Sequence, residues 1–329
     1  MLLTVTVPAY NVEKYIGQCL ESFVLPERAG QFEVLVINDG STDGTEAAAL
    51  GYQRSYPDIF RVMTKENGGH GSGINTGIAN ARGKYFRVVD GDDCIDTEAF
   101  EKFLDLLSHT DADLVTTGFY CCDAVTMEKH ELHSPVVSGK YGEGIYRFDD
   151  ICGDLLVRMH SITYRTLMLR EGGVKIDEHS FYVDMEYNMF PVPYIETVCL
   201  SDLAVYKYRL GLDGQSVSVA GMKAHAGQHE RVIMRCLDFL TEVSDGISPQ
   251  KKGYIEKLCA EMTAMQHLVF LRYPVRDKKK AEAMRFDRML KERCPGVYAA
   301  NSNAAVALLR ASGYLLYPAA QAAVRLLKR

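Results

Sequence analysis

Short apolar runs rich in β-branched residues alternate with segments of helical periodicity as far as residue 107. The apolar runs lie near residues 3–8, 33–38, 60–64 and 85–90. Between the first two runs, apolar side chains recur at the spacing of one helix face, at Val12, Ile16, Cys19, Leu20 and Phe23. Strands that alternate with amphipathic helices are typical of repeated βαβ units. The pattern predicts an α/β fold with a mostly parallel, Rossmann-like sheet flanked by helices.

The pattern changes after the fourth run. Thr97 is the expected cap of a helix whose apolar stripe is Phe100, Phe103, Leu104 and Leu107. An extended segment at 114–120 then leads into polar, hairpin-like sequence to about residue 147. Residues 148–220 mix loops and strands. We therefore expect one α/β domain over residues 1–220, in which the pattern changes at about residue 113.

The rest of the chain has helical periodicity from about residue 225. Two apolar stripes support this prediction, the first at Ile233, Cys236, Leu237 and Leu240 and the second at Ile255, Leu258, Met262, Met265 and Val269. We expect residues 221–329 to form a helical C-terminal extension.

Charge and cysteine content exclude some functions. The formal net charge of -6 argues against nucleic acid as a partner, because nucleic-acid binding normally needs a basic face. Nine cysteines without a CxxC pair fit a reducing compartment better than a disulfide framework. The N-terminus opens into a strand-like run without a signal-peptide pattern, and no apolar stretch reaches the ~20 residues of a membrane span. We expect a cytoplasmic protein.

The C-terminal region carries excess basic charge. Residues 276–293 contain eight Lys or Arg against four Asp or Glu. The tail from residue 301 has no acid, and its basic residues are Arg310, Arg325, Lys328 and Arg329. An apolar tail with a basic end can lie on an anionic membrane surface, and it can equally pack on its own domain with a solvated basic face. Both interpretations stay open, so peripheral membrane contact is an expectation for this tail.

Each of the four predicted strands ends in small or polar residues. The four strand ends are Pro8-Ala9-Tyr10-Asn11, Asn38-Asp39-Gly40-Ser41-Thr42-Asp43, Asn67-Gly68-Gly69-His70-Gly71 and Asp90-Gly91-Asp92-Asp93. Ligands of open parallel sheets bind outside the carboxyl ends of the strands. We therefore expect these four segments to meet at one crevice.

The fourth strand end is the strongest chemical signal. An apolar run ends abruptly in three carboxylates, Asp90, Asp92 and Asp93. Carboxylates on a short loop can hold Mg²⁺ or Mn²⁺, which usually takes further ligands from substrate phosphates. The alternative is a solvated acidic turn, since Asp favours turns for its local hydrogen bonds.

Two other features of the strand ends allow more than one interpretation. Asp39 can accept hydrogen bonds from a ribose or a base, or it can be a turn carboxylate that bonds to the backbone two residues on. Gly71, Gly73 and Gly77 suggest a dinucleotide-binding fingerprint, but the third glycine is one place late and the motif does not follow the first strand. A dehydrogenase is therefore a weak alternative.

The order and spacing of the four segments resemble the family 2 glycosyltransferases, which have the GT-A fold. The matching pieces are Val7-Pro8-Ala9-Tyr10-Asn11 with Tyr15-Ile16, Val36 through Thr45, Glu66-Asn67-Gly68-Gly69 through Asn75-Thr76-Gly77, and Gly83-Lys84-Tyr85 leading to Asp90-Gly91-Asp92-Asp93. This four-part match covers about 95 residues.

The resemblance implies that residues 1–112 form the nucleotide-sugar half of the domain and residues 113–220 the acceptor half. It also implies roles for single residues. Pro8, Ala9, Tyr10 and Asp39 would form the nucleotide pocket, and the other donor contacts would come from Asn67, Gly69, Asn75, Asp90 and Gly91. Asp90 and Asp92 would form the DxD-type motif, with Asp92 and Asp93 as ligands of Mn²⁺ or Mg²⁺ and Asp90 as an assisting third ligand. One position departs from the family: many members carry Arg or Lys where this chain has Ile74.

Further along the chain, the segment from Ile176 to Glu186 looks like the family's segment with the catalytic base. The resemblance assigns the base to Asp184, with Glu186 as the alternative, and the family's usual Glu-Asp pair reads Val183-Asp184 here. Tyr206-Lys207-Tyr208-Arg209 looks like the family's basic segment. In that segment Arg209 could neutralise the leaving diphosphate or be a solvated charge.

The sequence thus predicts a metal-dependent, inverting glycosyltransferase that moves a sugar from a nucleoside diphosphate sugar, with UDP as the expected nucleotide. The acceptor would be a saccharide or a lipid-linked hydroxyl, and the expected role is bacterial surface polysaccharide or glycolipid synthesis. Two alternatives remain: a sugar-nucleotide-binding protein without turnover, suggested by Ile74 and Val183, and a glycoside hydrolase with two carboxylates at its site.

Overall fold

The computed structural model describes residues 1–135, 140–155, 157–212, 219–273 and 279–326. Contacts within the chain divide it into two compact units, Met1–Leu212 and Asp213–Arg329. We describe each unit separately. The basic residues Lys328 and Arg329 of the predicted membrane-contacting tail lie outside the described residues.

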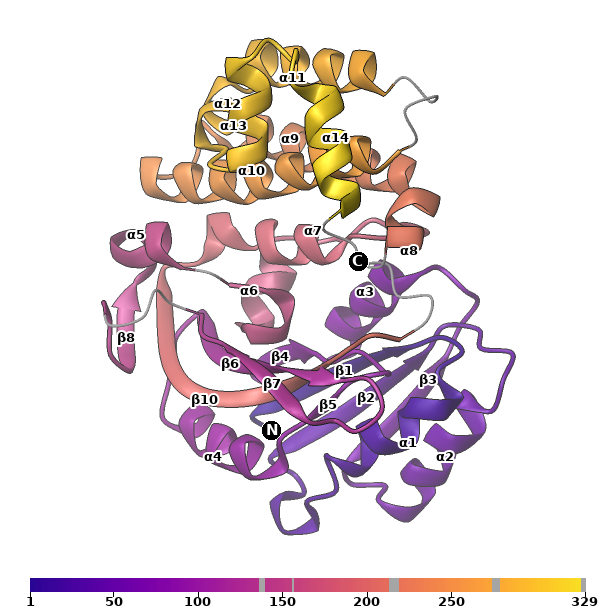
Figure 1. The fold of residues 1–329 in the computed structure, drawn as a ribbon. Coiled ribbons are helices and arrows are strands. Elements are labelled where there is room, and N and C mark those ends of the chain that lie inside the picture. The colour runs from indigo at the N-terminus through magenta and orange to yellow at the C-terminus, as the bar shows by residue number, and fades with distance from the viewer. Residues whose placement is uncertain (136–139, 156, 213–218, 274–278, 327–329) are drawn as a thin grey trace. The chain divides into compact units, whose positions relative to one another are not determined.

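The four predicted strands form a parallel half-sheet in the first unit (Figure 1). They are β1 (Leu3–Ala9), β2 (Phe32–Asn38), β3 (Phe60–Thr64) and β4 (Tyr85–Val88). Their order is β3-β2-β1-β4, and every pair is parallel. All positions of β1 and β2 are buried, because helices cover both faces of a parallel sheet. This burial explains why these strands appear in the sequence as continuous apolar runs.

Four helices follow these strands in the chain. They are α1 (Glu13–Glu21), α2 (Thr45–Ser55), α3 (His70–Asn80) and α4 (Thr97–Ser108). In Figure 1, α1, α2 and α4 lie on the opposite side of the sheet from α3. The main core fills the side of α1 and α4, where the rings of Phe23 and Phe32 pack edge-on against Phe100 at centroid distances of 5.4 and 5.2 Å.

The helix at 97–108 begins one residue differently from the sequence prediction. The N-cap is Asp96, whose carboxylate accepts a hydrogen bond from the N–H of Ala99 at 3.2 Å, and Thr97 is the first helical residue. The Thr97 hydroxyl instead donates to the carbonyl of Ser22 at 2.9 Å. The predicted stripe of this helix is fully buried, as expected.

Beyond β4 the sheet becomes mixed. The remaining strands are β5 (Cys94–Ile95), β6 (Leu114–Asp123), β7 (Lys129–His133), β8 (Gly144–Arg147), β9 (Ile162–Arg165) and β10 (Thr197–Leu210). The order continues β4-β9-β6-β10-β5, with β9 antiparallel to both neighbours and β10 parallel to β6. β7 pairs with β6 as an antiparallel hairpin, and β8 pairs with β10. The predicted hairpin-like segment is therefore present.

Short helices and 3₁₀ turns fill most of the remaining connections of the first unit. The α-helices are α5 (Phe148–Ile151), α6 (Thr166–Glu171) and α7 (Asp184–Met189), and the 3₁₀ turns are η1 (Pro26–Arg28), η2 (Cys152–Asp154), η3 (Met159–Ser161) and η4 (Val192–Tyr194). α6 packs against α3 and β9, and α7 packs against η3. The predicted α/β fold class, a sheet flanked by helices, is confirmed, and the parallel arrangement holds for the first half of the sheet.

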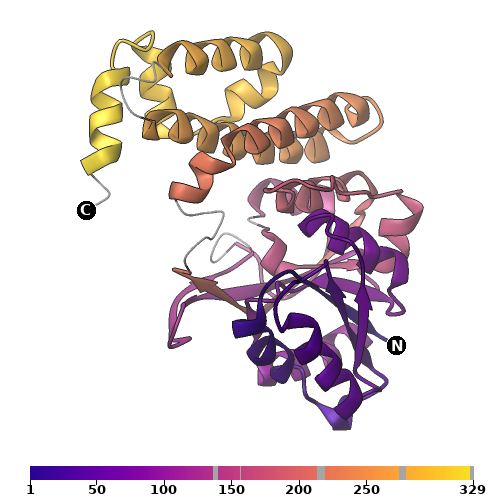
Figure 2. The same ribbon diagram turned by 90° about the vertical axis from the view of Figure 1, so that its right-hand side faces the viewer.

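The second unit is helical wherever the structure describes it (Figure 2). Its elements are α8 (Val219–Ala224), α9 (Ala226–Val243), α10 (Pro249–Arg272), α11 (Lys280–Arg293), α12 (Pro295–Ala300), α13 (Ala304–Ala311) and α14 (Tyr317–Leu326). α10 contacts α9, α11, α12 and α14. The predicted stripes on α9 and α10 are buried except for Met265, which is 37 % exposed. Among the described residues, no helix has the length and apolar content to cross a membrane.

Candidate functional site

The carboxyl ends of β1, β2 and β3 are joined by hydrogen bonds around Asp39. Its carboxylate is only 3 % exposed and accepts bonds from Lys65 Nζ at 2.9 Å and from the N–H groups of Gly68 and Gly69 at 3.0 and 2.8 Å. The Asn67 amide donates to the carbonyl of Asp39 at 2.9 Å. Asp39 therefore bonds to a loop 29 residues further on, and the prediction of a local turn carboxylate is wrong.

Tyr10 marks the open end of β1. Pro8 and Ala9 are buried within the strand, whereas Tyr10 is 51 % exposed. The chain turns at Asn11, where φ is +53°, and the Asn11 side chain accepts a hydrogen bond from the N–H of Thr42 at 2.8 Å. Asn and Asp tolerate this left-handed backbone better than other non-glycine residues. The turn leaves the Tyr10 ring free to contact a ligand.

Asp90 and His70 form the first ion pair of the site. His70 Nε2 lies 2.7 Å from Asp90 Oδ1. Burial alone would raise the pKa of Asp90, but the imidazole of His70 outweighs it and the pKa is lowered. Burial would likewise lower the pKa of His70, and Asp90 raises it. The two groups therefore stabilise each other's charged forms.

Asp92 and Asp93 follow on the same turn in different surroundings. Asp93 is buried and accepts hydrogen bonds from the Tyr206 hydroxyl at 2.6 Å and from the N–H of Arg209 at 2.7 Å. Burial and the charges of Asp92 and Asp90 raise the pKa of Asp93 well above its usual range. Asp92 is partly exposed, and burial together with Asp90 raises its pKa to about 6. Like charges are therefore held close together on this turn.

The turn itself fits tightly against β1. A Cβ at Gly91 would lie 3.1 Å from a methyl group of Val12 and 3.2 Å from the carbonyl oxygen of Pro8. Glycine at this position lets the acidic turn approach the end of β1 closely. The acidic turn and the end of β1 therefore lie close together.

His160, on η3, adds an imidazole to the acidic group. One ligand atom from each of Asp90, Asp93 and His160 lies within 4.8 Å of the others. Burial lowers the pKa of His160 to about 4, so the ring is neutral. Its Nδ1 atom is buried, and no hydrogen-bond partner for it occurs in the described part of the chain. Two carboxylates and a buried imidazole that has one unpartnered nitrogen form a set of ligands that fits a divalent cation.

Arg209 is placed differently from a solvated charge. It is 3 % exposed, and its guanidinium donates to the carbonyls of Asp92 at 2.7 Å and Ala124 at 2.6 Å, and to the Gln18 side chain. The guanidinium also lies over the Tyr15 ring at 5.1 Å. The prediction of a solvated strand-end charge is wrong, because these groups bury the side chain. Arg209 thus holds the acidic turn in place through Asp92 and Asp93.

The N-terminus of α3 packs against the loop that precedes α7. Asn75 clamps this loop: its side chain donates to the carbonyl of Ile176 at 2.8 Å and accepts from the N–H of Ile176 at 2.9 Å. His179 donates its N–H to the carbonyl of Gly68 at 2.5 Å. A Cβ at Gly69, where φ is +82°, would lie 3.2 Å from the His179 nitrogen. Ile74 is fully buried in α3.

Asp184 begins α7 and faces the same acidic group. Burial raises the pKa of Asp184, His70 offsets part of this rise, and Asp90 adds to it. Glu186, the alternative base, is fully buried and accepts the N–H of Asp177 at 2.7 Å. Val183 is buried as well. The charge of Asp184 is therefore coupled to His70 and Asp90.

Three residues of this site had no assigned role in the sequence interpretation: His70, His160 and Tyr206. His70 lies in the third of the four polar strand ends. Only the folding of the sheet brings it beside Asp90. Tyr206 donates to Asp93 across 113 residues of sequence. Only its place in the basic segment near Arg209 could have indicated it. No spacing in the chain links His160 to the acidic turn.

A mixed α/β sheet with an Asp-Gly-Asp-Asp turn and a facing carboxylate at its strand ends defines the class of GT-A glycosyltransferases. The family model described as glycosyl transferase family 2 matches residues 4–171. That match covers about half of the 329 residues, and the chain belongs to this family.

Individual relatives match this chain over only part of their own length. An uncharacterized glycosyltransferase EpsJ of Bacillus subtilis is 37% identical over 119 residues, which is 36% of this chain and 34% of that protein. Chondroitin synthase of Escherichia coli is 26% identical over 243 residues, 73% of this chain and 33% of that protein. The chain thus spans about a third of the length of these two relatives.

Solved structures share the fold. TarS 1-349 of S. aureus, crystallised in complex with UDP-GlcNAc, has a TM-score of 0.64 at 18% identity over 95% of this chain and 92% of that chain. A complex of the same fragment with UDP has a TM-score of 0.60 at 20% identity, over 92% of this chain and 88% of that chain. The predicted GT-A architecture is therefore confirmed.

Proposed function

We propose that this protein transfers a sugar, with inversion, from a nucleoside diphosphate sugar to an acceptor hydroxyl in a metal-dependent reaction. The observation that carries the proposal is the meeting of the acidic turn at Asp90–Asp93 with Asp184, linked through His70. UDP is the proposed nucleotide, because the structural neighbour TarS is described in complex with UDP-GlcNAc and with UDP. We propose residues 1–220 as the catalytic domain.

The donor nucleotide would lie at the ends of β1, β2 and β3. Tyr10 offers an exposed ring that can stack on a base, beside the buried Pro8 and Ala9. The Asp39 carboxylate has its acceptor positions engaged by Lys65, Gly68 and Gly69. A ribose or base hydrogen bond to Asp39 therefore requires exchange of one of these contacts. Asn67, Gly69 and Asn75 support the pocket by fixing the loop at 67–71.

Asp92 and Asp90 are the proposed ligands of Mg²⁺ or Mn²⁺, with the imidazole of His160 close to Asp90. No other side chain hydrogen-bonds to Asp92 in the described residues, so its oxygens are available. Asp93 is the least available of the three predicted ligands, since its oxygens accept bonds from Tyr206 and Arg209. A bound divalent cation would offset the charge that develops on the departing diphosphate.

Asp184 is the proposed general base. The acceptor oxygen attacks the anomeric carbon while the hydroxyl proton passes to the Asp184 carboxylate. The bond from the anomeric carbon to the diphosphate oxygen breaks, and its electron pair leaves with the nucleotide. A hydroxyl is a poor nucleophile, and a base with a raised pKa is a better proton acceptor near neutral pH. His70, whose pKa is raised beside Asp90, offsets part of the rise in the pKa of Asp184.

We propose that Arg209 supports the reaction indirectly, by holding the acidic turn in place. Its guanidinium donates to the carbonyls of Asp92 and Ala124 and to the Gln18 side chain, and these bonds fix the backbone of Asp92. Ile74 is buried in α3, and a basic side chain at that position would have no route to solvent without disturbing the helix packing.

For the biological role we propose assembly of a bacterial surface polysaccharide or glycolipid, in line with the relative named chondroitin synthase. The acceptor would be a saccharide or a lipid-linked hydroxyl at the cytoplasmic face of the membrane. Arg310 does not support membrane contact through basic charge, because its side chain pairs with Asp287 at 2.8 Å. Leu308, Leu315 and Leu316 are exposed and are the better candidates for such contact.

Calorimetric titration of the full chain with UDP, GDP and dTDP tests the donor site. We expect UDP to bind in the presence of Mn²⁺ and binding to be lost with EDTA and with Asp92→Ala. The control is Asp202→Ala, which removes an exposed carboxylate in β10 and should leave binding unchanged.

Failure of every nucleotide to bind a folded protein would overturn the proposal. UDP binding without transfer to any acceptor would favour a sugar-nucleotide-binding protein. Release of sugar from oligosaccharides in the absence of nucleotide would favour a hydrolase.

A further inference from the structure

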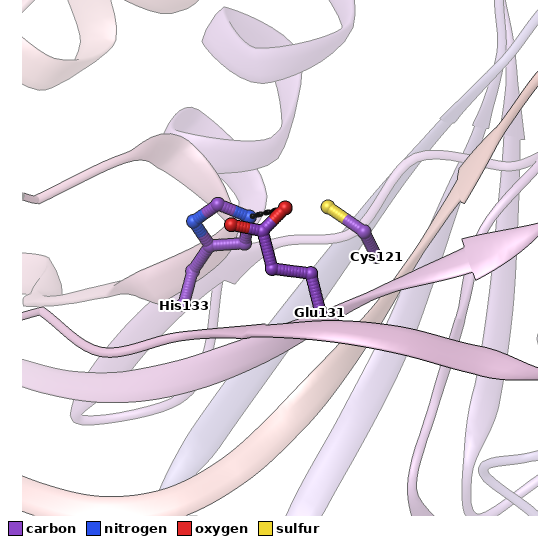
Figure 3. A group of neighbouring side chains, drawn as sticks. All are labelled: Cys121, Glu131 and His133. Carbon is purple, nitrogen blue, oxygen red and sulfur yellow. Dashed lines mark ion pairs between the residues drawn. The ribbon is translucent and has the colours of Figure 1, made fainter.

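The hairpin of β6 and β7 carries three metal-ligating side chains on one face, outside the donor site. Figure 3 shows Cys121 from β6 with Glu131 and His133 from β7 directed toward one another. One ligand atom from each lies within 4.8 Å of the others. The His133 Nε2 and Glu131 Oε2 atoms are 3.5 Å apart.

The strand register explains why these side chains meet. Cys121 pairs with Glu131 and Phe119 pairs with His133, so Glu131 lies opposite Cys121 and His133 lies diagonal to it. Side chains two residues apart point to the same face of a strand, and directly opposed Cβ atoms are about 5 Å apart. The register shifts after Cys121, where Cys122 pairs with Lys129, which is the mark of a β-bulge around His130.

Packing fixes one of the three ligands in place. The imidazole of His133 stacks on the ring of Phe119 with a centroid distance of 4.6 Å and an interplanar angle of 10°. This stack presents the edge of the imidazole, with its nitrogen atoms, to the neighbouring side chains. Cys121 is half-buried and Glu131 is exposed, so both can adjust by rotation about their side-chain bonds.

The chemical types of the three ligand groups indicate which metal they would bind. A thiolate, an imidazole and a carboxylate are ligands of Zn²⁺, whereas Mg²⁺ and Mn²⁺ prefer oxygen ligands. Zinc–ligand bonds of about 2.0–2.3 Å place tetrahedral ligand atoms roughly 3.5 Å apart, a spacing that the His133–Glu131 pair already has. We propose that Cys121, Glu131 and His133 bind Zn²⁺, with the fourth position open to water or to a ligand group.

Binding at this site would tie the two strands of the hairpin together. β7 pairs only with β6 within the described sheet, and four of its five residues are exposed. An edge strand with little buried surface gains most from a cross-strand link. The Cys121 thiol loses its proton to solvent when the sulfur–zinc bond forms. All nine cysteines are free, so the thiol is not consumed by a disulfide.

Cobalt(II) absorption spectroscopy on the full, reduced chain tests the proposal, with Zn²⁺ as competitor. We expect a thiolate-to-cobalt charge-transfer band that Zn²⁺ abolishes. The band should disappear with Cys121→Ser, and His133→Ala should weaken Zn²⁺ binding by more than ~100-fold, since even outer-shell partners of a metal are worth 10- to 100-fold.

Two control variants separate this site from its surroundings. His130→Ala removes an exposed imidazole on the same strand and should leave the band and the affinity unchanged. Asp92→Ala removes a proposed ligand of the donor site and should also leave the band intact. A charge-transfer band that survives Cys121→Ser, the absence of any band, or a band lost with Asp92→Ala would each overturn the proposed zinc site.

Discussion

Single carboxylates near the strand ends differ in the group that neutralises each of them. Asp39 has the ammonium group of Lys65, and Asp90 has the imidazole of His70. Asp93 has only a hydroxyl and a backbone N–H, and its pKa is raised. Asp184 is paired with neither a Lys nor an Arg in the described residues, and its pKa is raised by burial. Asp39 and Asp90 are thus each paired with a basic side chain, whereas the pKa values of Asp93 and Asp184 are raised.

Replacing Asp184 by Asn tests its assignment as the base. We expect Asp184→Asn to lower kcat for sugar transfer by ~10²- to 10⁴-fold, because the amide cannot take the hydroxyl proton. UDP affinity measured by calorimetry should change less than about threefold by the same argument, because the base acts on the acceptor. Asp202→Asn is the matched surface control. A variant with unchanged kcat would remove Asp184 from the mechanism.

The pH profile of transfer should reflect the same residue. Only the ionised form of Asp184 can accept a proton, so activity falls as the pH decreases through its pKa. Because that pKa is raised, the acid limb of kcat/KM should lie at a higher pH than an ordinary Asp would give. A profile of kcat/KM against pH measures this limb, and an acid limb within the ordinary Asp range would contradict the assignment.

Gly71 allows the closest approach between α3 and the loop before α7. A Cβ there would clash with the carbonyl oxygen of Asp177 and lie 2.9 Å from a methyl group of Ile176. We expect Gly71→Ala to destabilise the protein by about 2 kcal/mol, a typical cost of overpacking, in urea denaturation. The control is Gly17→Ala in α1, where nothing lies within 4 Å of the new Cβ and a small gain in stability is expected.

Among the elements, α4 depends on one charged cap. The Asp96 carboxylate caps the helix through Ala99 and pairs with Lys129 at 3.0 Å and with Lys207 at 3.2 Å. Burial acts to raise its pKa, but these hydrogen bonds and charges lower it to about 2. Asp96 thus connects α4 with β7 and β10.

Acid should release this stabilisation. Asp96 has a folded pKa of about 2 against about 3.9 in an unfolded chain, so its contribution is full above ~pH 4 and is lost as the pH falls toward 2. We expect Asp96→Asn to cost about 1 kcal/mol at pH 7 and to be nearly equal to the wild type at pH 2, because the amide keeps the cap but not the ion pairs. Urea denaturation at several pH values measures this difference.

A matched control for this prediction is Asp58→Asn, which replaces an exposed carboxylate between α2 and β3 that has no ion-pair partner in the described residues. Its effect should be small and independent of pH. If Asp96→Asn shows the same difference from the wild type at pH 2 and at pH 7, the lysine pairs do not contribute to stability.

The sequence predicted best the strands that are buried on both faces. β1 to β4 were predicted within two residues because strands buried on both faces appear as continuous apolar runs. The cap at Asp96 was missed because Asp and Thr are both good N-cap residues and stand side by side. Met265 lies on the edge of the α10 stripe, and periodicity alone does not distinguish the edge of a stripe from its centre.

For the site, the sequence located the loops but not the pairings among them. Tyr10, Asp39, Asp90 and Asp92 follow predicted strands, so parallel topology was enough to bring them together. The position of Arg209 was not predictable, because its hydrogen bond to the Asp92 carbonyl spans 117 residues of sequence. The base and metal assignments stay predictions, since only nucleotide binding and transfer can test them.

At the scale of the whole chain, every proposed donor, metal and base residue lies in the unit Met1–Leu212. We therefore expect a fragment of residues 1–212 to bind UDP with Mn²⁺ within about threefold of the full chain, since the residues that make the proposed donor contacts are retained. Calorimetry on both proteins measures this. A folded fragment that does not bind UDP would show that residues 213–329 contribute to the donor site.

A shorter fragment provides the control. Ending the chain at residue 203 removes Tyr206 and Arg209, which hold the acidic turn through Asp93 and Asp92. We expect that fragment to lose UDP binding even though β1 to β4 are intact. Retained binding would show that the turn keeps its shape without β10.

The contacts of Tyr206 and Arg209 with the acidic turn also constrain when the protein can become active during its synthesis. The ribosome produces the side chains that fasten the turn some 115 residues after the turn itself. The nascent protein would therefore carry a loosely held, strongly negative turn while those residues are being added. Donor binding competence should appear abruptly, once β10 has left the exit tunnel and paired with β6.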